Sequence, residues 1–199
     1  MDILLYALAT FAVIVFFNTQ EQKRRIALLG QHLGRYRLEA LMEELAQGYL
    51  RALGESDPQR REQIWSLLTG SENAIADQFK RFAAEFSRVD EASARVSKIA
   101  LPWAARLFPS AAFDVREAFR IHAQGIGEAV ANTGQRSPRD KAFTLSAELF
   151  LMQHTCHWFC RSRTVASARL LKRHQVSHAQ VLDAVSPATR RAYGALTGI

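Results

Sequence analysis

The sequence predicts an all-α protein, with a single N-terminal transmembrane helix followed by an irregular cytoplasmic bundle of five to seven helices. Apolar residues recur at helical spacings of three and four along most of the 199 residues. No stretch alternates apolar and polar residues as a half-buried strand would. Serine, threonine and aspartate precede several of the periodic stretches, where they suit helix N-caps. The chain beyond the first apolar stretch is long enough for one domain with a hydrophobic core.

The first element is residues 1–19, which we predict to be a membrane anchor. Residues 3–17 contain no charge, glycine, proline or amide. As a helix they extend about 22 Å, less than a hydrocarbon core of about 30 Å, so insertion requires bilayer thinning or association with other helices. Two alternatives stay open: a helix buried in the soluble domain, and a cleaved signal peptide. Against the latter, Asp2 stands where a signal peptide carries positive charge, and no small-residue cleavage site follows the span.

The charges that follow the span predict its orientation. Lys23, Arg24 and Arg25 come soon after it, and the positive-inside rule places the N-terminus outside and the bulk of the chain in the cytoplasm. Two cysteines suit a reducing compartment. Arginine outnumbers lysine 21 to 5, which we interpret as the composition of a GC-rich bacterial genome. The predicted location is therefore the bacterial inner membrane.

Residues 20–56 are expected to form a juxtamembrane helix continuous with the anchor, because no proline or turn cluster interrupts the sequence before Leu53. The helical period of apolar residues in its second half ends at Gly54. Gly30 and Gly34 stand four residues apart. This spacing suits close approach of another helix, a hinge, or no special role.

Residues 57–199 are expected to form the helical cytoplasmic domain. Helix starts are predicted from N-cap residues and ends from glycine or asparagine. The first expected helix begins after Asp57 and ends near Gly70, and the second covers about Glu72 to Val89. A third covers Val115 to Val130, and a fourth extends from Ser137 to about Arg173. Two short helices begin at Ser177 and Ser186.

The C-terminal region carries most of the net charge. Residues 161–199 contain seven cations against Asp183 alone, while the whole chain has a formal net charge of +7. A basic helical face attracts anionic lipid head groups, nucleic acid or an acidic protein. The predicted anionic-surface-binding residues are Lys23, Arg24, Arg25, Arg161, Arg169, Lys172, Arg173, Arg190 and Arg191. Solvated arginines that reflect coding bias are the alternative interpretation.

The segment from Ser186 to Tyr193, followed by Leu196, resembles the opening helix of the core-binding domain of tyrosine recombinases. In that family a capped, basic helix packs its tyrosine beside DNA. The resemblance covers about eleven residues and lacks the family's catalytic domain. It implies contact with DNA or RNA.

Cys156, His157 and Cys160 form the one cluster with metal-ligand residue types, and on a helix they lie within about 100° of arc. They are weak metal candidates, because the spacing is not that of a zinc knuckle and this segment is the most apolar of the domain. The sequence holds no nucleophile elbow, phosphate-binding glycine loop or zinc-protease motif. We therefore expect no catalytic residue, no cofactor and no enzyme.

The sequence favours an inner-membrane scaffold or adaptor that presents a helical domain to a protein partner or to further copies of itself. The first alternative is a membrane-tethered nucleic-acid binder that uses the basic C-terminal helices. A metal-dependent enzyme built around Cys156 is the third hypothesis.

Overall fold

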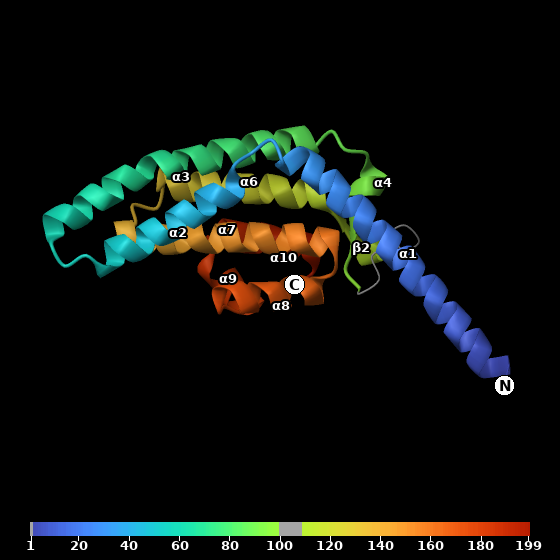
Figure 1. Ribbon diagram of the computed structural model, residues 1–199. Helices are drawn as coiled ribbons and strands as arrows, with labels where there is room; N and C mark the ends of the chain where they lie inside the picture. The colour runs from blue at the N-terminus through green and yellow to red at the C-terminus, as the bar shows by residue number, and fades with distance from the viewer. Residues whose placement is uncertain (1, 100–108) are drawn as a thin grey trace.

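The computed structural model describes residues 2–99 and 109–199, and within them the fold is all-α with one short hairpin (Figure 1). The long N-terminal helix α1, the one-turn helix α4 and seven further α-helices make up most of this part of the chain. The elements are α1 Asp2–Leu33, α2 Leu38–Gly54, α3 Pro58–Phe86, α4 Glu91–Ala94, β1 Arg95–Ser97, η1 Pro109–Ala111, β2 Ala112–Asp114, α6 Val115–Ala131, α7 Pro138–Cys160, α8 Arg163–His174, α9 His178–Ala184 and α10 Pro187–Thr197.

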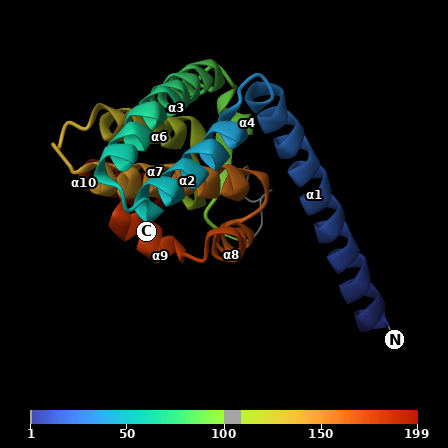
Figure 2. The same cartoon turned by 60° about the vertical axis from the view of Figure 1, so that its left-hand side comes forward.

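The first half of α1 projects away from the bundle in both views (Figures 1 and 2). Every side chain from 3 to 17 is exposed, apart from a half-buried Ile14. The apolar segment is therefore not a buried core helix of this domain. By length and composition α1 could cross a membrane.

The single helix expected over residues 20–56 is broken. The anchor helix continues only to Leu33, and the chain turns at residues 34–37 before α2 begins. A Cβ built at Gly30 would meet no atom within 4 Å, so among the described residues no second helix packs against this position. The break lets Leu38 and Leu41 of α2 be buried in the core against α3. A continuous helix over residues 20–56 would bury less apolar area, so the break is favoured by the hydrophobic effect.

Two other predicted boundaries differ. The helices expected on either side of Gly70 are one helix, α3, because Glu72 does not cap a new start and instead accepts a hydrogen bond from the Tyr49 hydroxyl at 2.8 Å. The helix expected from Ser137 to Arg173 is divided into α7 and α8. Ser162 caps α8 by accepting from Val165 N at 3.3 Å, which ends α7 at Cys160.

The core lies where α3, α6 and α7 pack together (Figure 1). Its centre is a cluster of fully buried phenylalanines whose ring centroids lie 5.1–6.2 Å apart. The cluster consists of Phe79, Phe82, Phe86, Phe119 and Phe159. Such aromatic pairs add to the hydrophobic stabilisation of the core.

The hairpin of β1 and β2 closes the end of the bundle beside α1. It pairs Val96 with Phe113 in antiparallel register. The Trp158 indole donates to Ser97 O at 3.0 Å, and its ring lies 4.8 Å from that of Phe113. The hairpin thus connects the chain around α4 to the C-terminal end of α7.

Candidate functional site

The second half of α1 is built into the domain through Arg25. This side chain is 2% exposed and donates to Glu21 Oε1 at 2.9 Å, to Phe159 O at 3.1 Å and to Arg95 O at 2.9 Å. Its guanidinium also lies 5.4 Å from the centroid of the Phe159 ring. The domain itself therefore holds this cation, whereas the sequence predicts that Arg25 faces an anionic surface.

Other polar contacts reinforce this anchor junction, by which we mean the contacts of residues 21–25 with the domain. Arg24 donates to Ser93 Oγ, and Arg161 donates to Gln22 Oε1. Arg161 is half-buried and joins the end of α7 to α1, so it too has a structural partner. Of the three predicted juxtamembrane cations, Lys23 and Arg24 keep exposed side chains.

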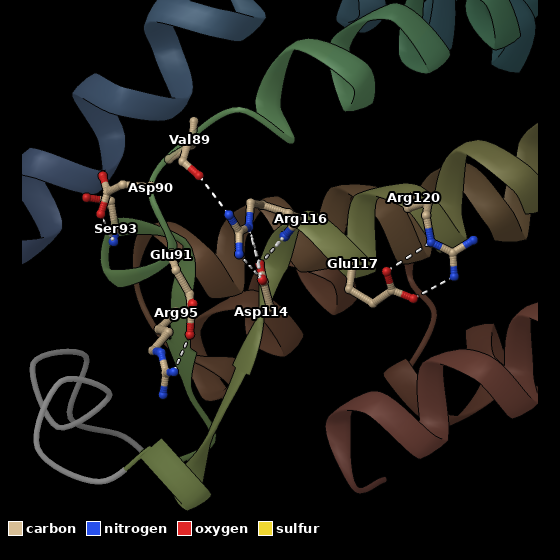
Figure 3. Close-up of polar contacts among 9 residues, drawn as sticks. All are labelled: Val89, Asp90, Glu91, Ser93, Arg95, Asp114, Arg116, Glu117 and Arg120. Atoms are coloured by element: carbon tan, nitrogen blue, oxygen red, sulfur yellow. Dashed lines mark hydrogen bonds and ion pairs between the residues drawn. The ribbon is translucent and has the colours of Figure 1, made fainter.

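Figure 3 shows the part of the domain that receives α1. Asp90 caps α4 by accepting from Ser93 N at 2.9 Å, and the Ser93 hydrogen bonds lower the pKa of Asp90. Arg116 connects this turn to β2, donating to Val89 O at 2.9 Å and pairing with Asp114 at 2.6 Å. The segment against which Arg24 and Arg25 rest is thus held in place by its own hydrogen bonds.

A groove of about 800 Å³ runs between α3 and α6, next to this corner. Small residues line it: Ala83, Ala84, Ala123, Gly127 and Ala131. Two ion pairs lie at its edge, as Figure 3 shows for Arg116 with Asp114 and for Arg120 with Glu117, and Lys80 and Glu128 also line it. Hydrogen bonding from Arg120 lowers the pKa of Glu117. The groove therefore has a floor of small residues, and two ion pairs lie at its edge.

The structure brings only three of the nine predicted cations together in one hollow. Arg169, Lys172 and Arg173 of α8 line a pocket of about 430 Å³ with His154 and His157 of α7, here called the basic pocket. The other C-terminal cations lie apart from it. Arg190 pairs with Asp183 at 2.7 Å on α9, and Arg191 lines a different pocket beside Glu128 and Arg136.

The weak metal candidates occupy unlike surroundings. Cys156 is buried, its thiol contacts Met152 Sδ at 3.9 Å, and burial raises its pKa. Burial also raises the pKa of Cys160 to about 11. His157 accepts a hydrogen bond from Arg169. In the part of the chain that the structure describes, no three ligand-type side chains are placed to hold a metal ion. Thiols that stay protonated are poor metal ligands.

A buried polar seam between α6, α7 and α10 was not predicted. His122 Nε2 lies 2.8 Å from Thr155 Oγ1, which lies 3.0 Å from the Tyr193 hydroxyl. Tyr193 is fully buried, so the resemblance to a DNA-contacting recombinase helix does not extend to the position of this tyrosine. In the same seam Glu148 accepts from Ser186 N at 2.9 Å, and burial raises its pKa.

The one sequence signal for this seam is Gly125, in the middle of α6. A Cβ there would lie 2.3 Å from Thr189 Oγ1 and 2.5 Å from Glu148 Oε2. The position therefore requires glycine for close approach of the three helices. A helix-interior glycine would have indicated a tight contact but not its partners.

Comparisons with protein-family models, with curated proteins and with solved structures gave no match to this chain.

Proposed function

We propose that the chain is a single-pass inner-membrane adaptor that holds a helical cytoplasmic domain in a fixed orientation at the bilayer and docks a protein partner there. The observation that carries the proposal is the dual character of α1. Its first half is exposed and apolar, whereas its second half contributes the buried residues Arg25 and Leu29 to the domain. A signal peptide that is cut away would not share one unbroken helix with such residues.

The direct passage from span to domain matters for the function. A flexible linker would let the domain rotate freely, whereas the anchor junction fixes α1 against α7 and the α4–β1 segment. A partner bound to the domain would then sit at a set height and angle above the membrane. This is the property that a scaffold needs.

The groove between α3 and α6 supports a docking place for a partner helix. A floor of alanine and glycine permits close approach of a helical backbone, and helix-in-groove binding is a recurrent mode of recognition. Because the floor consists of small residues and two of the edge cations are already paired with acids, an apolar helix face suits it better than a strongly charged one.

Photo-crosslinking in native membranes tests this proposal. A photoreactive amino acid at Gln124, which lines the groove, should give a discrete crosslinked protein, while the same amino acid at the exposed Gln59 should not. Gly127→Phe should abolish the crosslink, since nothing lies within 4 Å of a Cβ there and the ring would fill the groove. A chain released from membranes by alkaline wash, or groove crosslinks no stronger than those at Gln59, would contradict it.

The nucleic-acid alternative stays a prediction with less support. Three of its predicted cations line one pocket and Arg191 lines another, while Arg173 and Arg190 are paired with acids. A bound strand needs a continuous basic track. Binding of single-stranded DNA that weakens steeply with added salt would restore this alternative.

A further inference from the structure

The basic pocket between α7 and α8 has the features of a ligand site. It encloses about 430 Å³, within the range of small-molecule pockets. Leu170 contributes an apolar wall, and the cations of α8 stand around it. This combination accepts a molecule with both a charged and an apolar part.

The charge of the pocket is one-sided. No acid lines it, and the nearest described acidic partner is Glu39 of α2, 3.8 Å from Arg173. Among the residues that the structure describes, neither Arg169 nor Lys172 is paired with a carboxylate. Arg169 instead donates to the His157 ring at 3.2 Å. A protonated imidazole could not accept that bond, so His157 is neutral in this arrangement.

His154 adds an independent observation. Its side chain lines the pocket yet is 1% exposed, with Nε2 3.1 Å from Ser167 Oγ and its ring stacked at 4.1 Å on that of His178. Nδ1 has no hydrogen-bond partner among the described residues. A buried polar atom without a partner costs stability, and this one belongs to a side chain that lines the pocket.

We propose that the basic pocket binds the phosphate group of a small organic phosphate, with Arg169 and Lys172 as its principal cationic contacts. A dianion with several oxygens uses more than one cation at once, and the planar guanidinium matches phosphate geometry. The apolar wall at Leu170 takes the organic part of the ligand. The same headgroup chemistry is offered by an anionic lipid, so the source of the phosphate is decided by experiment.

Calorimetry of the full chain in nanodiscs of neutral lipid, with pyrophosphate and inorganic phosphate as probes, tests the proposal at low salt. We expect saturable binding that Arg169→Gln and Lys172→Gln each weaken about tenfold or more, since each removes a charged hydrogen bond. Arg190→Gln is the matched control, removing the same charge from an exposed site on α10, and should change affinity less than about twofold. All three side chains are exposed, so folding should be preserved, as circular dichroism would verify.

Two further readouts complete the test. Bound phosphate should raise the pKa of His157. In the free protein burial and the neighbouring Arg169 and Arg173 lower this pKa, while Glu39 raises it. NMR of the isotope-labelled histidine rings measures the pKa with and without phosphate. Nanodiscs that contain phosphatidate distinguish the sources. Competition with pyrophosphate there would identify a lipid headgroup, and undiminished pyrophosphate affinity would identify a soluble ligand. No heat with either probe, or an equal loss in the Arg190→Gln control, would overturn the proposal.

Discussion

Replacing Arg25 with methionine should destabilise the domain severely, although sequence alone marks this residue as a surface cation. The guanidinium is 2% exposed and donates to Glu21 and to two main-chain carbonyls at 2.9–3.1 Å. Methionine keeps the apolar stem but leaves Glu21, which is 9% exposed, without this partner. Breaking a buried ion pair from one side costs about 3–5 kcal/mol. We expect a loss of that size in the free energy of unfolding.

The assay is urea unfolding of the full chain in neutral detergent micelles, followed by far-ultraviolet circular dichroism and by tryptophan fluorescence, to which the buried Trp158 contributes. Lys23→Ala is the matched control and should change stability by less than about 0.5 kcal/mol. Glu21→Gln added to Arg25→Met should recover about 1 kcal/mol or more, because it removes a buried negative charge that Arg25 no longer balances. An Arg25→Met cost below about 1 kcal/mol, or equal to that of Lys23→Ala, would refute the buried anchor junction.

Two further predictions concern residues of α6, α7 and α9. Gly125→Ala should cost about 1–3 kcal/mol because its Cβ meets Glu148 and Thr189, whereas Gly127→Ala, with open space around it, should gain about 0.5–1 kcal/mol; equal effects in thermal unfolding would contradict this. Burial lowers the pKa of His122 in the folded protein to about 3 and that of His178 to about 4. Both side chains ionise near pH 6.5 in the unfolded chain, so the folded state is favoured fully above pH 6.5. As the pH falls from 6.5 toward the folded pKa values, the free energy of unfolding should decrease by up to about 1.4 kcal/mol per site and pH unit. The raised pKa of Glu148 has the opposite effect, since its contribution to stability is lost as the pH rises. The dependence of the unfolding midpoint on pH is therefore measured between pH 7.5 and 5.5 in a Glu148→Gln background. A midpoint that does not change with pH would refute the claim that these histidines are buried in their neutral form.

Helical periodicity and caps predict the all-α fold because both are local properties of the chain. The caps at Asp57, Ser137, Ser177 and Ser186 all form. Boundaries failed where tertiary contacts decide between equally good local options. Glu72 accepts hydrogen bonds from Tyr49 and Lys141 instead of capping a helix. Ser162 caps α8, whereas the apolar pattern alone predicts that α8 continues from α7. The three-residue strands are too short to show alternation.

The candidate site was only partly predictable for a related reason. The helical spacing of Arg169, Lys172 and Arg173 places them on one side of α8, and the structure gathers them at one pocket. Charge type alone does not reveal burial, so Arg25 and Arg161 could not be told from exposed cations. His154 and Tyr193 acquire their environments from α8, α9 and α7, which are distant along the chain or separated by turns.

The measurement that bears most directly on the adaptor is the distance distribution between a spin label in the anchor and one in the domain. The labels are attached at Ala12 and Ser87, which are both exposed, in a Cys156→Ala and Cys160→Ser background. Pulsed electron paramagnetic resonance in nanodiscs measures the distance between them. If the anchor junction fixes the domain to its membrane helix, the distribution is single and narrow, and Arg25→Met broadens it. A broad distribution in the parent chain would show a flexible tether and contradict the fixed orientation on which the proposed function rests.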